Sequence, residues 1–354
     1  MNSDLSDVLK YSDEVAAAIA SGSPIVALES TIISHGLPRP TNLEVAREVE
    51  AIVRAHGATP ATIAVIDGSV HIGLSDEELV TIATRDNILK ASSRDLAIAV
   101  AFGKSAATTV AATAHLAVMA GIKVFATGGL GGVHRGAQES FDESADLTAL
   151  SALDITVVCA GVKSILDVGA TLERLETLAI GVIGYKTKKF PGFYLTDSGF
   201  EIEYQADTAD QIASAIKARA SMKTNSSALI VANPVKNQMD KKLHDSILAS
   251  GLASAEKEGI TAEPAALELI SIKADGGLRD ALSMFDLNVT FSTDNALRHA
   301  DVLENLHILD SDYYFQLTDF FVNQNHTDAL VLLDEIMRKG FDGQQFIAGL
   351  SEHF

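Results

Sequence analysis

The sequence predicts an α/β fold: a three-layer α/β/α domain with a mostly parallel central sheet, followed by an all-α C-terminal segment. Short apolar runs such as residues 24–29 (PIVALE) and 61–67 have the composition of strands buried on both faces, as in parallel sheets covered by helices. Segments with helical spacing of apolar residues alternate with these runs. From residue 260 onward the spacing is helical throughout, which predicts the all-α segment.

The elements are expected in a regular order along the first part of the chain. Ser75 and Glu78 have the spacing of a capping box, which predicts that a helix begins there. Helices are expected at residues 4–20, 41–56 and 106–120, with an Ala-rich helix that ends near residue 103. Strands are expected at residues 24–29, 61–67, 121–127, 157–162, 178–184 and 228–234, and a hairpin-like piece at residues 68–73.

A glycine-rich loop follows the strand expected at residues 121–127. Residues 128–132 read GGLGG, and His134, Asp142 and Asp146 come soon after them. Glycines let backbone N–H groups approach a ligand closely and form a nest for an anion. The pattern favours a phosphorylated ligand, although a glycine-rich turn after a strand is also common in proteins without one.

Three charged side chains are candidates for chemistry at strand ends. Lys163 follows a buried-looking strand, and a lysine in apolar surroundings loses part of its proton affinity and becomes nucleophilic. Glu29 stands at the carboxyl end of the strand at residues 24–29, where α/β proteins bind ligands. Lys90, at the edge of an apolar patch, is a candidate phosphate contact. The ordinary alternatives are a solvated lysine at a helix start and a loop carboxylate.

Composition excludes several classes of partner. The 354 residues include 47 acidic and 27 basic ones, and the formal charge of −20 gives no general attraction to nucleic acid or an anionic membrane. The single cysteine, Cys159, excludes an intramolecular disulfide and suits a reducing compartment. The sequence has neither a secretory signal nor an apolar run of about 18 residues. We therefore expect a cytoplasmic protein without nucleic-acid or membrane partners.

Several long motifs together resemble the pseudouridine-5′-phosphate glycosidase family. The resemblance covers about residues 13–259. It is carried by VALESTIISHGLP at residues 26–38, TTVAAT at 108–113, VFATGGLGGVHRGA at 124–137, FDESADL at 141–147 and VVCAGVKSILD at 157–167. It implies a manganese-dependent enzyme, usually a homotrimer. Such an enzyme reversibly cleaves the C–C glycosidic bond of pseudouridine 5′-phosphate, giving uracil and ribose 5-phosphate.

The resemblance also implies roles for individual residues. By motif position, Lys163 matches the nucleophile, Glu29 the proton donor and Asp142 the Mn²⁺ ligand. The positions that match substrate-binding residues are Lys90, Val110, Ser144, Ala145 and Asp146, and His134 is assigned to the site lining. A C–C bond is not broken by protonating a leaving oxygen or nitrogen. A neutral lysine attacking C1′, with an acid at the ring oxygen, would open the ribose as an iminium-type adduct.

The end of the chain resembles a different protein. Residues 255–354 are similar to the gamma/tau subunit of a bacterial DNA polymerase III clamp loader, at the end of its ATPase lid and the start of its helical collar. Residues 260–354 contain 16 acidic and 5 basic residues. We therefore predict a chimera, with a glycosidase-like domain at residues 1–259 and a helical segment at residues 260–354. The tail has no phosphate loop to act with Arg279, so ATP binding is not expected.

Two other interpretations remain open at this point. The asparagine-bearing helix that usually ends the glycosidase family is not recognisable, so the chain could be an inactive fusion whose tail binds clamp-loader subunits. A pigment-synthesis protein of the same fold, acting on phosphosugars, would differ in substrate only.

Overall fold

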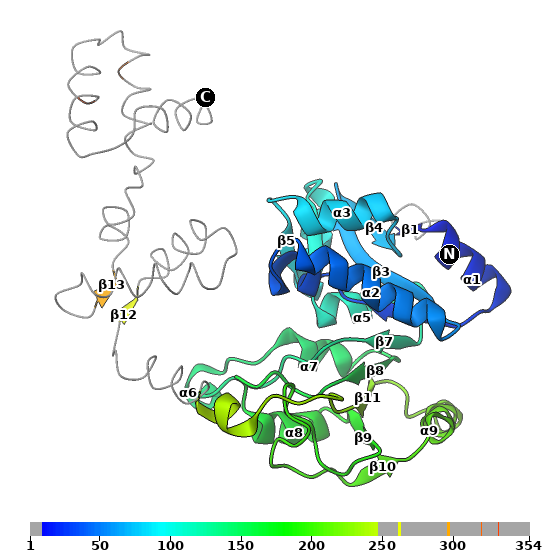
Figure 1. Ribbon diagram of the computed structural model, residues 1–354, viewed down its shortest axis with the longest axis vertical. Coiled ribbons are helices and arrows are strands. Elements are labelled where there is room, and N and C mark those ends of the chain that lie inside the picture. The colour runs from blue at the N-terminus through cyan, green and yellow to red at the C-terminus, as the bar shows by residue number, and fades with distance from the viewer. Residues whose placement is uncertain (1–8, 247–260, 263–295, 298–319, 321–331, 333–354) are drawn as a thin grey trace. The chain divides into compact units, whose positions relative to one another are not determined.

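The computed structural model describes residues 9–246, 261–262, 296–297, 320 and 332 (Figure 1). The chain divides into two compact units, Met1–Ala249 and Ser250–Phe354. The first unit contains the α/β domain. The predicted boundary after residue 259 falls outside the described residues and stays a prediction.

An eleven-stranded sheet forms the centre of the first unit. Its strands are β1 (Leu9–Tyr11), β2 (Ile25–Leu28), β3 (Thr59–Ile66), β4 (Ser69–Ile72), β5 (Leu89–Ala91), β6 (Ala106–Thr108), β7 (Val124–Ala126), β8 (Thr156–Cys159), β9 (Gly181–Tyr185), β10 (Tyr204–Ala206) and β11 (Leu229–Ala232). Nine of them follow the order β1-β4-β3-β2-β7-β8-β11-β9-β10, and β6 joins β3 to β5. Only the β3–β4 and β3–β6 pairs are antiparallel, which confirms the mostly parallel sheet.

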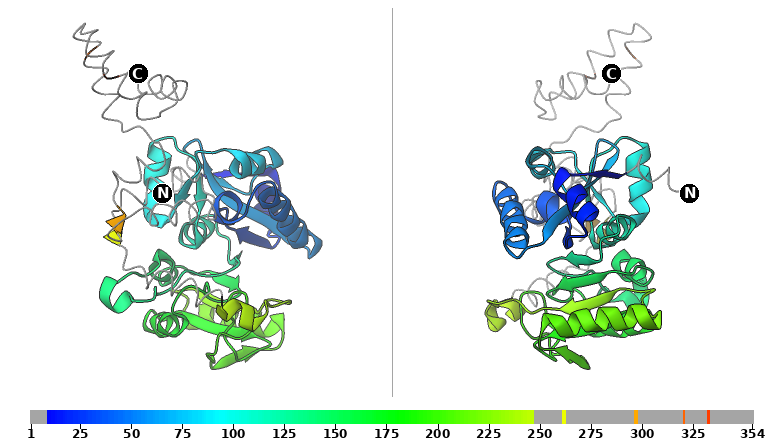
Figure 2. Two further views of the ribbon diagram at one scale, coloured as in Figure 1. Left: turned by 60° about the vertical axis from the view of Figure 1, so that its left-hand side comes forward. Right: turned by 90° about the vertical axis from the view of Figure 1, so that its right-hand side faces the viewer.

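Helices lie on both sides of this sheet, as Figure 2 shows. They are α1 (Asp13–Ser21), α2 (Thr41–Ala55), α3 (Asp76–Thr84), α4 (Leu96–Ala101), α5 (Val110–Met119), α6 (Ala137–Ser140), α7 (Ala145–Leu150), α8 (Val168–Thr177) and α9 (Ala209–Met222), with a π-helical turn η1 (Ile32–Gly36) and a 3₁₀ turn η2 (Ser93–Asp95). The predicted capping box of Ser75 and Glu78 begins α3. The apolar core between the layers includes the fully buried side chains of Phe125, Leu130 and Leu147.

Two predicted helices begin later than their sequences suggest. The helix expected at residues 4–20 begins at Asp13, because Leu9–Tyr11 instead forms the edge strand β1 beside β4. The helix expected at residues 106–120 begins at Val110, because Ala106–Thr108 forms β6 between β3 and β5. Leucine, lysine and alanine favour helices in isolation, so pairing with neighbouring strands overrides the local preference in both segments.

The second unit differs in one respect from the all-α prediction. Among its described residues, β12 (Thr261–Ala262) and β13 (Ala296–Leu297) form a short parallel pair. The apolar spacing is a local pattern, so it cannot reveal a two-residue strand pair such as β12–β13, whose members are far apart in sequence. Arg279 and the clamp-loader-like helices lie outside the described residues.

Candidate active site

The candidate site is built on three neighbouring strands whose carboxyl ends meet at one edge of the sheet. Strands β2, β7 and β8 are parallel, and Leu28 is paired with Ala126, which in turn is paired with Val158. The strand ends are therefore level. Glu29 follows β2 and Thr127 follows β7 at this edge, and the segment with Lys163 follows β8.

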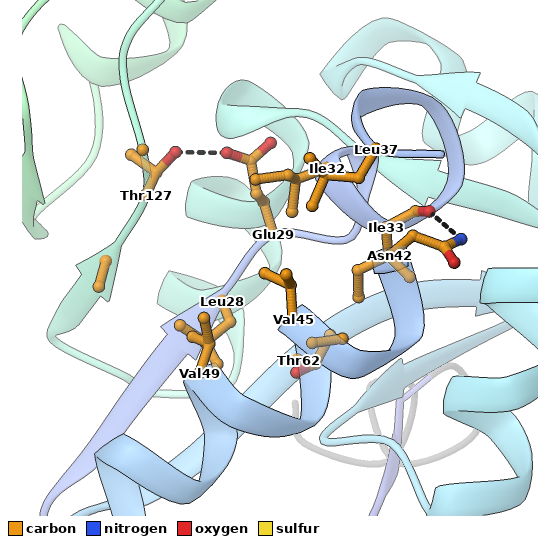
Figure 3. A pocket seen from close by; sticks show the side chains of 13 residues that line it. Leu28, Glu29, Ile32, Ile33, Leu37, Asn42, Val45, Val49, Thr62 and Thr127 are labelled. Atoms are coloured by element: carbon orange, nitrogen blue, oxygen red, sulfur yellow. Dashed lines mark hydrogen bonds between the residues drawn. The ribbon is translucent and has the colours of Figure 1, made fainter. Parts of the chain in front are cut away.

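Glu29 is the carboxyl group at the centre of this edge. The hydroxyl of Thr127 donates a hydrogen bond to Glu29 Oε1, and Figure 3 shows the two side chains facing each other. Burial raises the pKa of Glu29, although the Thr127 hydrogen bond and the positive charge of Lys163 act in the opposite direction. The pKa of Glu29 also responds to the charges of Asp146, which raises it, and Lys90, which lowers it. Glu29 therefore lies within electrostatic reach of three predicted site residues, and its raised pKa suits a proton donor.

Lys163 lies beside the glycine-rich loop, but its surroundings differ from those predicted. The Leu130 N–H donates to the Gly161 carbonyl at 2.9 Å, and the Lys163 N–H donates to the Leu130 carbonyl at 3.1 Å. Lys163 is exposed, which corrects the expectation of an apolar environment. The extended backbone here turns Val162 into the core and leaves the next side chain, Lys163, in solvent.

Asp146 links the glycine-rich loop to helix α5 by hydrogen bonds. Its Oδ2 accepts the Gly131 N–H and its Oδ1 accepts the Ala111 N–H, both at 2.9 Å, and the residue is only 6% exposed. A Cβ added to Gly131 would lie 2.7 Å from Asp146 Oδ2 and 2.6 Å from Ser144 Cβ, so a side chain there would disturb the contact. Both Asp146 oxygens thus contact backbone amides, whereas contact with the substrate remains a prediction.

We expect Asp146→Asn to lower the free energy of unfolding by about 2–4 kcal/mol, because the amide NH₂ would face one of the two backbone N–H groups. Urea denaturation would measure the change. Asp210→Asn is the matched control, since Asp210 is an exposed acidic residue in the first turn of α9. Equal stability of the two variants would contradict the role assigned to the Asp146 carboxylate.

The other predicted substrate-binding residues lie at the starts of α5 and α7 and on β5. Ser144 is the N-cap of α7 and accepts the Asp146 N–H at 3.2 Å, and Ala145 is exposed at the first position of the same helix. Val110 is buried at the start of α5, next to the amide that Asp146 binds. Lys90 is exposed on β5, where it is paired with Ala107. Asp146 therefore fixes the loop relative to the starts of α5 and α7.

His134 and Asp142 form an exposed pair beyond the glycine-rich loop. His134 Nδ1 lies 3.6 Å from Asp142 Oδ2, and the His134 N–H donates to the Asp142 carbonyl at 3.0 Å. Among the described residues, no group of three or more His, Cys, Asp or Glu side chains could hold a metal ion. Asp142 can therefore offer one carboxylate to a hard cation that is otherwise coordinated by water or substrate oxygens.

An apolar cavity of about 290 Å³ adjoins Glu29 and was not predicted from the sequence. Ile32 and Leu37, from the segment after Glu29, and Val45 and Val49 of α2 line it (Figure 3). Its lining comes from β2 and the segment after it, from α2, from β3 and from the end of β7, and no local pattern connects these stretches. Thr127 was missed as well, although its position directly after a strand and before the glycines is the same kind of signal that identified Glu29.

A lysine, a half-buried acid with a raised pKa and a glycine-rich loop at the carboxyl edge of a parallel sheet define an α/β enzyme for a small-molecule substrate. Residues 14–294 match the family described as indigoidine synthase A like protein, and the chain belongs to this family. The match extends beyond the predicted junction near residue 259. Within the described part of the chain, no helix has the length and apolar character needed to span a membrane.

Curated relatives in this family carry a more specific name. The chain is 58% identical to a pseudouridine-5′-phosphate glycosidase of Salinispora tropica, over 72% of this chain and 79% of the relative. It is 51% identical to that of Streptomyces griseus, over 82% and 92% of the two chains.

Two solved structures share the fold. A prealnumycin C-glycosynthase in complex with ribulose 5-phosphate has a TM-score of 0.68 and 35% identity, over 79% of this chain and 90% of its own. An indigoidine synthase A-like protein from Thermotoga maritima has a TM-score of 0.65 and 32% identity, over 85% and 95% of the two chains.

Proposed function

We propose that this enzyme reversibly cleaves the C–C glycosidic bond of pseudouridine 5′-phosphate to give uracil and ribose 5-phosphate. The observation that carries the proposal is the position of Glu29 at one edge of the sheet, a half-buried acid whose pKa is raised by burial and lowered by the positive charge of Lys163. The names of the curated relatives support the same reaction. The comparisons support an active enzyme and do not support the inactive fusion.

The reaction follows from the two side chains. The unprotonated Nζ of Lys163 attacks C1′ while Glu29 gives its proton to the ring oxygen, so the C1′–O bond breaks and the ribose opens. The C1′–C5 bond then breaks and C1′ becomes an iminium carbon bound to lysine. The electrons of the bond remain on uracil C5, which takes up the proton that the attacking amine has lost. Water hydrolyses this iminium, which releases ribose 5-phosphate and restores the amine.

Borohydride trapping tests the proposal directly. With ribose 5-phosphate, borohydride is expected to reduce the iminium to a stable secondary amine, and peptide mass mapping is expected to place the added sugar on Lys163. Uracil release from pseudouridine 5′-phosphate would confirm the substrate. A folded protein that forms no adduct at Lys163 would overturn the mechanism, and an adduct without uracil release would favour another aglycone.

We further propose that Mn²⁺ is the cofactor and that Asp142 is its protein ligand. When bound, the cation would offset negative charge from the phosphate and the carboxylates. Dialysis against EDTA is expected to lower activity and added Mn²⁺ to restore it, whereas Asp142→Asn should raise the Mn²⁺ concentration that gives half-maximal activity. Glu139→Gln, a change at an exposed acid of α6, is the control. Activity that is unaffected by EDTA would contradict this assignment.

The proposal extends to a cytoplasmic homotrimer with a chimeric tail at residues 260–354 that resembles the clamp-loader subunit. Analytical ultracentrifugation of the full chain would measure the oligomeric state. Sequencing genomic DNA across the codons for residues 256–260 would show whether the two parts are joined in the gene.

A further inference from the structure

A loop at residues 190–195 is attached to the segment that carries Lys163. The Phe193 N–H donates to the Ala160 carbonyl at 2.9 Å, and the Ser164 hydroxyl donates to the Gly192 carbonyl at 3.0 Å. Gly161 and Gly192 also form an isolated antiparallel bridge. These bonds lie on both sides of Lys163 in sequence, so the loop and the lysine segment form one structural unit.

Phe193 has an unusual backbone conformation for a bulky residue. Its φ of 65° lies in the left-handed region, where side chains other than those of glycine and asparagine are disfavoured. Residues in such conformations persist only where the surrounding structure holds them, and they are concentrated at functional sites. The hydrogen bond to Ala160 is one contact that holds Phe193 in this conformation.

The half-buried ring of Phe193 rests on the glycine-rich loop. A Cβ added to Gly129 would lie 2.6 Å from Phe193 Cε2, and one added to Gly128 would lie 3.7 Å from the same atom. Only a glycine at position 129 leaves room for the ring. Phe193 therefore contacts the glycine-rich loop with its side chain and the lysine segment with its backbone.

We propose that Phe193 is a positioning residue that holds the start of the glycine-rich loop, at Gly129, against the lysine segment, in addition to the direct backbone hydrogen bonds of Leu130 with Gly161 and Lys163. This role rests on the proposed function, in which the lysine attacks C1′, and on the expectation from the sequence that the glycine-rich loop binds the phosphate. The distance between the phosphate-binding loop and the Lys163 amine matters because moving the reacting atoms by about 1 Å can lower the rate about 100-fold. When the phosphate is bound at the loop, the Phe193 ring would thus keep C1′ of the sugar in position for attack by Lys163.

The rate of borohydride-trapped adduct formation with ribose 5-phosphate and with ribose tests this role. Phe193→Ala is expected to slow trapping of ribose 5-phosphate by about 10- to 100-fold. Trapping of ribose, which has no phosphate to anchor, should change much less, so the ratio of the two rates falls. Phe193→Tyr keeps the ring and should restore the ratio.

Phe200→Ala is the matched control, because Phe200 also packs its ring on a glycine, Gly169 of α8, where an added Cβ would lie 2.9 Å from Phe200 Cε1. We expect this variant to leave the ratio of the two rates unchanged. Gly129→Ala, whose new methyl group would displace the Phe193 ring, is a second variant if Phe193→Ala does not fold, and it should lower the same ratio.

The outcomes separate this role from the proposed function. A wild-type protein that traps neither sugar would overturn the proposed function itself. Wild-type trapping combined with an unchanged ratio in both Phe193→Ala and Gly129→Ala would overturn only the role of Phe193. An equal fall in the ratio for Phe200→Ala would do the same, because it would show a general effect of lost packing.

Discussion

Lys163→Arg is expected to reduce kcat for uracil release on the order of 10⁴-fold or more, the scale seen when an enzyme loses its nucleophile. Arginine keeps the positive charge, but its guanidinium is not deprotonated in proteins and cannot form the iminium. Because Lys163 is exposed, the fold should remain intact. Steady-state assays of uracil release, with thermal unfolding measured in parallel, would check both expectations.

Lys104→Arg is the matched control for this experiment, since Lys104 is also an exposed lysine but precedes β6. It should have wild-type activity. A Lys163→Arg enzyme with more than a few per cent of wild-type kcat would show that the amine is not the nucleophile, and the reaction would then need another electron sink.

Glu29→Gln is expected to lower kcat by about 10²- to 10⁴-fold, the usual contribution of a general acid. Glutamine has nearly the same shape and can still accept the Thr127 hydrogen bond, but it has no proton to give to the ring oxygen. A measured loss of less than tenfold would indicate that another group protonates the sugar.

The pH dependence of kcat/KM should show the same acid. Burial raises the pKa of Glu29, and a general acid acts in its protonated form, so activity is present below this pKa and is lost as the pH rises through it. Thr127→Val removes a hydrogen bond that lowers the pKa of Glu29, so the alkaline limb of the profile should move to higher pH. The limb should disappear in Glu29→Gln. An alkaline limb that stays in place in both variants would contradict the assignment.

The sequence by itself predicted the mostly parallel α/β architecture, and it placed Glu29 and the glycine-rich loop at the ends of strands. Runs such as that at residues 24–29 are apolar on both faces, which is typical of a parallel sheet covered by helices, and the carboxyl ends of parallel strands meet at one edge. The sequence therefore predicts that Glu29 and the glycine-rich loop lie at a common edge. The Ser75–Glu78 capping box was equally readable, because its hydrogen bonds join residues only three positions apart.

Only the tertiary structure decided how these groups are held. Asp146 contacts amides at positions 111 and 131, and Phe193 lies against Gly129 and donates to the Ala160 carbonyl. Such partners are brought together by chain folding and leave no periodic pattern in the sequence. The exposure of Lys163 was misjudged for a related reason, since burial of its strand does not specify which way a side chain points after the strand has ended.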